Sequence, residues 1–186
     1  TGNEIMSGDT VDSNSALIAQ RFGEAGLGIY RKVTVGDDIA LLRTELADMT
    51  TKADLIIVNG GLGPTTDDLT AEILAAVAGV QLQQHPQAVT HLKQWCAKRN
   101  LQLNAANLKQ SMLPTGATIV DNPIGSAVGF EMTLGRCRII CTPGVPSELA
   151  AMLGPIVTDL AAQVQQAPGR SILRLQTFGL GESTAQ

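Results

Sequence analysis

One stretch, residues 54–70, constrains the fold of this chain more than any other. It begins with a short apolar run over residues 55–58 that is rich in β-branched side chains and flanked by turn residues. Such a run is typical of a central parallel strand that is covered on both faces. Glycines and a proline follow, and apolar residues then recur at helical spacing as far as Gly79. The stretch therefore predicts a buried strand, a tight turn and a helix.

The turn after this strand has the chemistry of an anion site. Gly60, Gly61 and Gly63 let backbone N–H groups approach a ligand because no Cβ is in the way. The N-terminus of the following helix adds unpaired N–H groups and a favourable dipole. Asp67 and Asp68 lie in the same turn, and carboxylates beside a phosphate site suggest a bridging divalent metal. The alternative is ordinary turn chemistry, in which a polar residue of this turn is simply the helix N-cap.

The rest of the amino-terminal half predicts alternating helices and strands. Apolar spacing indicates helices over residues 14–25 and 39–49, with a strand over residues 29–35 between them. This alternating order is that of a doubly wound α/β fold with a parallel sheet. Ligands of such sheets collect beyond the carboxyl ends of the strands. We therefore expect the acidic turns of the chain to meet at that edge.

The carboxy-terminal half predicts a second strand–turn–helix unit of similar layout. A hairpin through residues 134–136 leads into an apolar strand that ends near Cys141. A turn containing two prolines follows, and then a helix that Pro155 should kink. The buried face of that helix is expected to consist of Leu149, Leu153, Ile156 and Leu160.

Other residues of this half are expected to have structural roles. His85 and His91, the two histidines, lie six residues apart in polar surroundings and are expected to face solvent. Residues 172–178 are predicted to form a last strand.

Composition narrows the classes of function. The chain has 186 residues, of which 44% are hydrophobic and 16% charged, so one domain with a well-packed core is expected. A net charge of -4 with scattered Lys and Arg argues against a nucleic-acid surface. The three cysteines lack zinc-ligand spacing and predict buried free thiols, as in a reducing cytosol. No stretch has the character of a signal peptide or the length of a membrane span, so we expect a cytoplasmic protein with no membrane partner.

Several motifs together resemble the amino-terminal domain of the CinA (competence-damage-inducible protein A) family. They occur in the family's order and cover nearly the whole chain: Thr1-Gly-Asn-Glu-Ile5, Gly8-Asp-Thr-Val-Asp-Ser-Asn14, Gly60-Gly-Leu-Gly-Pro-Thr-Thr-Asp-Asp-Leu-Thr70, Asn122-Pro-Ile-Gly125 with Gly129-Phe130, and Thr142-Pro-Gly-Val-Pro-Ser-Glu148. The first half is also similar to the molybdopterin-binding fold of MogA and MoaB proteins, whose V-x-D turn is matched by Val35-Gly-Asp37. The proline-containing motifs favour the CinA branch.

The resemblance implies a fold and an activity. The fold is a three-layer α/β/α arrangement with a mostly parallel sheet, in a protein that self-associates as a dimer or trimer. The activity is metal-dependent hydrolysis of the pyrophosphate bond of ADP-ribose or a similar nucleoside diphosphate sugar, with Mg²⁺ or a similar ion as cofactor. The alternative is a protein that binds molybdopterin or a nucleotide without hydrolysis. Family members often carry a separate carboxy-terminal domain that deamidates nicotinamide mononucleotide, to which no residues here correspond.

The resemblance also assigns roles to residues. Asp37 and Asp68 are expected to hold the metal and to be catalytic. The residues expected to bind phosphate or nucleotide are Gly60, Gly61, Gly63, Pro64, Thr65, Thr70, Gly125, Ser126, Pro143 and Gly144. Further residues expected at the edge of the site are Asn3, Glu4, Asp9, Asp12, Asn14 and Glu148. Asn3 stands where the family has an acid, so an amide replaces a carboxylate there.

We expect the domain to span residues 1–168. Its first strand is expected upstream of Thr1, because the chain opens on a turn. Residues 169–186 are expected to begin a following segment.

Overall fold

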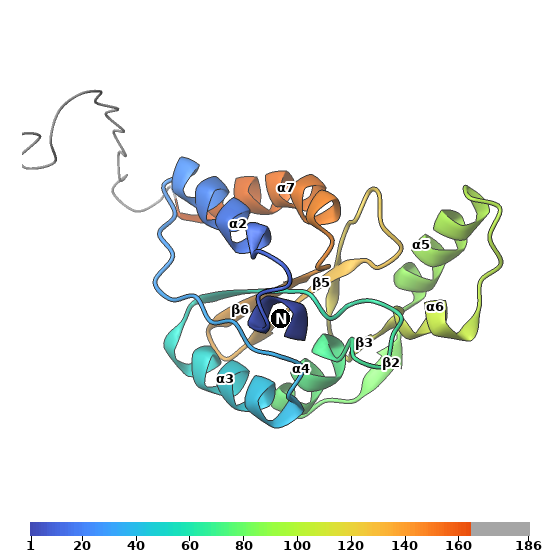
Figure 1. The fold of residues 1–186 in the computed structure, drawn as a ribbon, viewed down its shortest axis with the longest axis horizontal. Coiled ribbons are helices and arrows are strands. Elements are labelled where there is room, and N and C mark those ends of the chain that lie inside the picture. Colours follow the sequence, from blue (N-terminus) through green and yellow to red (C-terminus); the bar gives the residue numbers. More distant parts are fainter. Residues whose placement is uncertain (165–186) are drawn as a thin grey trace, which may run out of the picture.

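A sheet between two layers of helices forms the centre of the computed structural model, which describes residues 1–164 (Figure 1). The sheet has the strand order β1-β6-β5-β4. Its strands are β1 (Leu55–Asn59), β4 (Thr118–Val120), β5 (Gly129–Leu134) and β6 (Cys137–Thr142). β1 pairs with β6 in parallel, whereas β5 pairs antiparallel with both β4 and β6. A separate antiparallel pair joins β2 (Leu82–Gln84) to β3 (Met112–Pro114).

The helices cover both faces of the sheet. In chain order they are α1 (Asn3–Met6), α2 (Ser13–Glu24), α3 (Ile39–Lys52), α4 (Thr70–Ala78), α5 (Pro86–Ala97), α6 (Ala105–Lys109) and α7 (Pro146–Val164). α2 packs with α7 on one face, and α3 packs with α4 on the other, while α5 and α6 lie beside the small β2–β3 pair (Figure 1). The predicted three-layer α/β/α class is confirmed.

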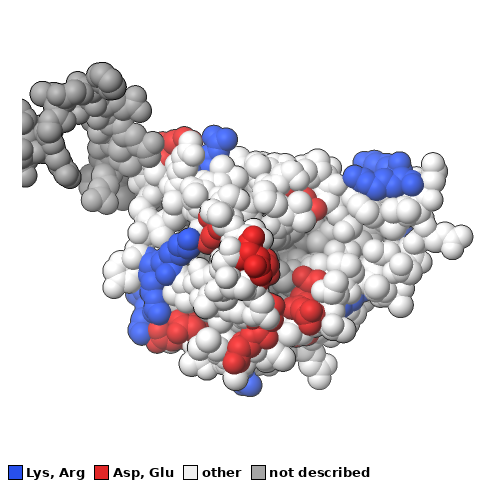
Figure 2. All heavy atoms as spheres, viewed as in Figure 1, with Lys and Arg blue, Asp and Glu red and all other residues white. Residues whose placement is uncertain are grey.

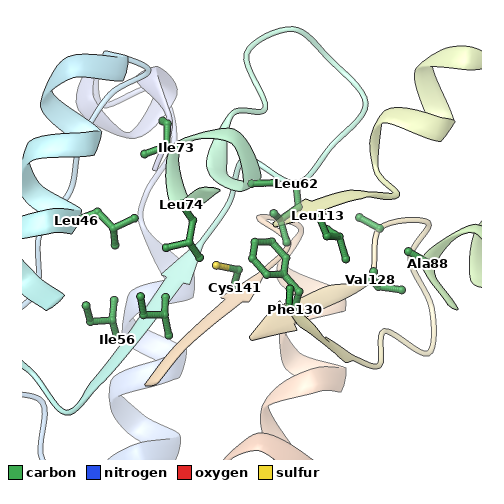
Figure 3. Packing of buried hydrophobic residues seen from close by; sticks show 14 of the residues in the cluster. Leu46, Ile56, Leu62, Ile73, Leu74, Ala88, Leu113, Val128, Phe130 and Cys141 are labelled. Carbon is green, nitrogen blue, oxygen red and sulfur yellow. The ribbon is translucent and has the colours of Figure 1, made fainter. Parts of the chain in front are cut away.

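Two apolar cores lie on opposite faces of the sheet. Side chains alternate between the faces of a strand, so along β6 Ile139 and Cys141 enter one core and Ile140 enters the other. The core under α3 and α4 is shown in Figure 3, where Cys141 lies between Leu74 and Phe130. All three of these side chains are fully buried. Packing on both faces explains the apolar runs over residues 55–58 of β1 and 139–141 of β6.

The strand–turn–helix predictions agree closely with the structure. The strand predicted over residues 55–58 is β1, the hairpin through residues 134–136 joins β5 to β6, and the predicted helices at residues 14–25 and 39–49 are α2 and α3. The four residues predicted for the inner face of α7 are at most 6% exposed. α7 runs on past Pro155 to Val164.

The strand predicted over residues 29–35 is wrong. These residues have no assigned helix or strand, and a cavity of about 1080 Å³ is lined both by them and by the outer edge of β1. A β-strand needs a neighbouring strand for its backbone hydrogen bonds. The alternation in the sequence therefore marked a segment that pairs with no strand of residues 1–164.

Two predictions lie outside the described residues, namely the strand over residues 172–178 and the domain boundary at residue 168. None of the helices described has both the length and the apolar character needed to cross a membrane.

Candidate functional site

The two strand–turn–helix units open at the same edge of the sheet. β1 ends at Asn59 and β6 ends at Thr142, and these two residues are paired in the parallel register. The Gly60 N–H continues this pairing by donating to Thr142 O at 2.9 Å. A Cβ built on Gly144 would lie 3.4 Å from Gly60 Cα. The predicted meeting of the first loop with Pro143 and Gly144 is therefore present.

Two side-chain amides hold this edge together. Asn59 Nδ2 donates to Thr142 Oγ1 at 3.1 Å and to Pro143 O at 2.7 Å. Its Oδ1 accepts from Asn14 Nδ2 at 2.8 Å, and the same Asn14 nitrogen donates to Gly144 O at 2.7 Å. Within residues 1–164 the buried Asn14 Oδ1 has no hydrogen-bond partner. Asn14 was predicted at the edge, but Asn59 was not, although a polar residue that ends an apolar run is a usable signal.

The glycine loop, residues 60–69, folds back on Thr70. Thr70 Oγ1 donates to Gly60 O at 2.7 Å, and the Thr70 N–H donates to Gly61 O at 3.1 Å. Gly60 and Gly61 have φ angles of 104° and 70°, a region that side chains disfavour. A Cβ on Gly61 would also collide with the Thr70 hydroxyl oxygen. The first two glycines are therefore required by the path of the loop.

Asp68 closes the glycine loop from within. Its Oδ2 accepts from the Thr65 N–H at 2.9 Å and from Thr65 Oγ1 at 2.7 Å. A Cβ on Gly63 would collide with this carboxylate. The N-cap position of α4 is Leu69, which makes no side-chain cap. The simple N-cap interpretation of the acidic turn is therefore wrong.

The outer side of the glycine loop is held by α6. Lys109 Nζ donates to Thr65 O and, at 2.6 Å, to Asp68 O. Gln110 Nε2 donates to Leu62 O at 3.4 Å. Neither residue was predicted, because nothing local in the sequence links α6 to a loop some forty residues earlier.

The predicted metal ligand Asp37 lies in a turn that faces Asn3. The Asn3 N–H donates to Asp37 Oδ2 at 3.2 Å, and the Asp37 N–H donates to Asn3 Oδ1 at 3.0 Å. The adjacent Gly2 N–H donates to Val35 O at 3.2 Å, and the Thr1 nitrogen donates to Asn59 O at 2.8 Å. Residues 1–3 thereby connect the Asp37 turn to the end of β1.

The other predicted acids of this edge have local partners. Asp12 caps α2 by accepting from the Ser15 N–H at 2.9 Å, and it pairs with Lys32 Nζ at 2.8 Å. Burial opposes ionisation of Asp12, but hydrogen bonds from Lys32 and Ser15 outweigh it and lower the pKa of Asp12 to about 2. Asp9 accepts from Ser7 Oγ at 2.6 Å. Acidic side chains gather around α1 at the centre of the face in Figure 2, and Lys and Arg lie toward its margins.

A second cluster joins Gly125 and Glu148 through a buried asparagine. Asn122 Nδ2 donates to Glu148 Oε2 at 2.7 Å, and Asn122 Oδ1 accepts from the Gly125 N–H at 2.9 Å. His91 Nε2 lies 2.9 Å from Gly125 O. The half-buried His91 therefore holds this loop, and its predicted solvent-facing position is wrong. His85 is also half-buried.

The remaining predicted residues are Glu4, Pro64 and Ser126. Glu4 and Pro64 are exposed, and Ser126 is half-buried. Their predicted roles in binding stay predictions.

The described carboxylates do not converge into a metal site. Asp37 is engaged by Asn3, whereas Asp68 is engaged by Thr65. Within residues 1–164 there is no group of three or more His, Cys, Asp and Glu side chains placed to hold an ion. A divalent ion usually takes several such oxygen ligands. The predicted shared metal on Asp37 and Asp68 therefore has no preformed ligand set and stays a prediction.

Comparison with known proteins places this geometry in a family. A CinA-like protein of Colwellia psychrerythraea is 53% identical over an alignment of 187 positions, which covers 100% of this chain and 43% of that protein. The nicotinamide-nucleotide amidohydrolase PncC of Shewanella oneidensis is 41% identical over an alignment of 190 positions, which covers 98% of this chain and 43% of that protein. The chain thus spans less than half the length of these curated relatives.

Solved structures agree with the sequence comparison. The CinA structure from Thermoplasma acidophilum has a TM-score of 0.78 at 32% identity and covers 86% of this chain and 94% of its own. The MoaB structure from Thermus thermophilus has a TM-score of 0.55 at 17% identity and covers 91% of this chain and 94% of its own. The second likeness shows the fold alone.

These comparisons correct the expected activity. The predicted metal-dependent ADP-ribose pyrophosphatase is wrong, because a relative that is 41% identical is named a nicotinamide-nucleotide amidohydrolase. An amidohydrolase cleaves a carbon–nitrogen bond of an amide, whereas a pyrophosphatase cleaves a phosphorus–oxygen bond.

Residues 1–163 match the family model described as "Probable molybdopterin binding domain". That match covers all five motifs, and the CinA structure has a similar fold over 86% of this chain. The chain belongs to this molybdopterin-binding domain family, within its CinA-like branch.

Proposed function

We propose that residues 1–164 bind the phosphate of a nicotinamide nucleotide at the glycine loop, in a protein that deamidates such nucleotides. The support for deamidation is the name of the Shewanella oneidensis relative, which is 41% identical to this chain. The support for phosphate binding is the loop itself.

The observation that carries the proposal is the orientation of the loop's peptide groups. Hydrogen bonds from other groups of the protein are accepted by the carbonyls of residues 60, 61, 62, 65 and 68. In a trans peptide the C=O and the following N–H point in opposite directions. The N–H groups of Gly61, Leu62, Gly63, Thr66 and Leu69 donate no hydrogen bond within the described residues. Successive free N–H groups on a glycine turn form a concavity that attracts an anion.

The same residues offer little for cleavage of an amide bond. Covalent hydrolysis needs a nucleophile that a neighbouring group activates. Cys96, Cys137 and Cys141 are buried, and burial raises the pKa of Cys137 and of Cys141, which disfavours their thiolates. His91 is engaged with Gly125 O. We therefore assign binding to this region and leave bond cleavage to the protein as a whole.

Calorimetric titration tests the proposal. Nicotinamide mononucleotide should bind to the purified protein, and nicotinamide riboside, which lacks the phosphate, should bind at least about tenfold more weakly. Gly61→Val should abolish the difference, because its side chain would displace Thr70. Equal affinities for the nucleotide and the riboside would contradict a phosphate site. Release of ammonia, assayed in parallel, separates binding from deamidation.

A second candidate ligand is molybdopterin, which the family description favours. Its phosphate would use the same N–H groups. If a molybdopterin analogue displaced bound nicotinamide mononucleotide with higher affinity, molybdopterin would become the first candidate ligand and the nucleotide the second.

The expected Mg²⁺ cofactor and the expected dimer or trimer stay predictions. Repeating the titration with Mg²⁺ and then with a chelator checks the first, and sedimentation at micromolar concentration checks the second. Asp68→Asn should keep a side-chain oxygen that accepts from Thr65 and should lower the affinity for any cation bound there.

A further inference from the structure

Lys109 is the last residue of α6, yet its ammonium group lies against the glycine loop. It donates to Thr65 O and to Asp68 O, and its third neighbour is Glu72 Oε1 at 3.8 Å. Its side chain is 26% exposed. Among the hydrogen bonds and ion pairs of residues 1–164, no other Lys or Arg side chain contacts residues 60–70. Lys109 is therefore the single cationic support of this loop in the part of the chain described.

The position of Lys109 is itself fixed. The short helix α6 begins with a capping box in which the side chains of Asn104 and Asn107 each accept from the other residue's N–H. The next residue, the buried Gln110, reaches Leu62 O. The end of α6 thus contacts the loop at Leu62, Thr65 and Asp68, and Lys109 makes two of these contacts.

The two carbonyls that Lys109 binds decide where two N–H groups point. The Thr65 carbonyl belongs to the same planar peptide as the Thr66 N–H, and the Asp68 carbonyl to the same peptide as the Leu69 N–H. When the carbonyls turn toward the ammonium, these N–H groups turn away from it. Both are without a hydrogen-bond partner in the described structure.

We propose that Lys109 is a positioning residue that holds the Thr66 and Leu69 N–H groups ready for the phosphate of the bound nucleotide. This inference rests on the proposed function, because it assigns the bound group to the same loop. Lys109 acts through the backbone and does not itself need to touch the ligand. Its charge also lies 3.8 Å from the Glu72 carboxylate, which it partly offsets.

Three variants test the role of Lys109. Lys109→Met removes the ammonium and keeps an unbranched apolar side chain, whereas Lys109→Arg keeps a cationic donor. Lys93→Met removes an exposed lysine of α5 that makes none of these contacts and serves as the control. The probes are nicotinamide mononucleotide and inorganic phosphate, titrated calorimetrically, together with the backbone amide NMR spectrum of each unliganded protein.

We expect Lys109→Met to shift the Thr66 and Leu69 amide resonances and to weaken nucleotide binding at least about tenfold. Lys109→Arg should restore most of the affinity, and Lys93→Met should change neither measurement. A purely structural support would lower the melting temperature of Lys109→Met while leaving its affinity for the nucleotide unchanged, and that result would overturn the inference.

The test also separates this inference from the proposed function. If the wild-type protein binds neither probe, the proposed phosphate site fails, and the amide spectra still decide whether Lys109 orients the two N–H groups. Unchanged Thr66 and Leu69 resonances in Lys109→Met would overturn the inference whatever the ligand. If the wild type binds and Lys109→Met binds equally well, the phosphate site stands and the positioning role fails.

Discussion

The two strand–turn–helix units share a layout but differ in how their turns are held. The first turn spans residues 60–69 between β1 and α4, and the second spans only residues 143–145 between β6 and α7. In the first turn the carbonyls of residues 60, 61, 62, 65 and 68 accept hydrogen bonds, whereas the N–H groups of residues 61, 62, 63, 66 and 69 donate none within residues 1–164. The second has the carbonyls of Pro143 and Gly144 bound by asparagine amides from β1 and α2. The comparison indicates that the first turn presents donors to a ligand, while the second supports the edge on which the first one rests.

The largest effect should come from the amide that joins the two turns. Asn59→Ala should lower the free energy of unfolding by about 2–3 kcal/mol, because it removes the donor to Pro143 O and leaves polar groups unpaired in a partly buried site. Denaturant unfolding measures this change. A loss below about 0.5 kcal/mol, which is typical of an unimportant surface position, would contradict a supporting role for the second turn.

A smaller loss of stability is expected from the corresponding hydrogen bond of the first turn, between Thr70 and Gly60. Thr70→Val keeps the shape of the side chain and removes the hydroxyl that donates to Gly60 O, so we expect a loss of about 1–2 kcal/mol in the free energy of unfolding. Thr70→Ser keeps the hydroxyl and serves as the control. If Val and Ser variants were equally stable, the hydroxyl would not be what holds the first turn.

One glycine substitution in each unit should change the stability of the protein, with opposite signs. Gly63→Ala should destabilise the protein by about 1 kcal/mol, because its Cβ would collide with the Asp68 carboxylate. In Gly154→Ala the Cβ meets nothing within 4 Å inside α7, so a gain of about 0.5–1 kcal/mol is expected from helix propensity. Thermal melts of both variants check the signs. Stabilisation by Gly63→Ala would show that Asp68 moves away without cost.

The smallest expected change in stability concerns Asp12, which caps α2. The pKa of Asp12 is lowered from 3.8 to about 2 in the folded protein, so its ionised form contributes stability above its unfolded pKa and loses it as the pH falls toward 2. Lys32 is half exposed, so the contribution is less than about 1 kcal/mol. Asp12→Asn should keep the cap and remove this pH dependence. Parallel wild-type and variant curves of unfolding free energy between pH 2 and 5 would contradict the assignment.

Much of the fold could be predicted from the sequence, because strands and helices with a buried face show a regular spacing of apolar residues. β1 and β6 were recognised as apolar runs, since both faces of the sheet are covered. The inner face of α7 was recognised from spacings of three and four residues. The same logic failed over residues 29–35, because alternation reports an extended chain and does not show whether a neighbouring strand is present to pair with it.

The candidate site was readable only in part. The glycine loop was found because the positive φ angles of Gly60 and Gly61 demand a residue without a side chain. Asp68 was found for a metal role, but in the structure its carboxylate is an acceptor for Thr65. Asn59, Lys109 and His91 were missed as contributors, because each acts on residues that are distant in the sequence.

By itself the sequence determined the α/β class, the position of the glycine loop and the buried faces of the main helices, because each follows from local backbone conformation or from the period of apolar residues. Only the tertiary structure decided which groups meet at the carboxyl edge. The pairing of Asn59 with Thr142 across β1 and β6 brings the two turns together, and the packing of α6 brings Lys109 to the first of them. Such contacts depend on how the layers pack, and no local pattern of residues encodes that.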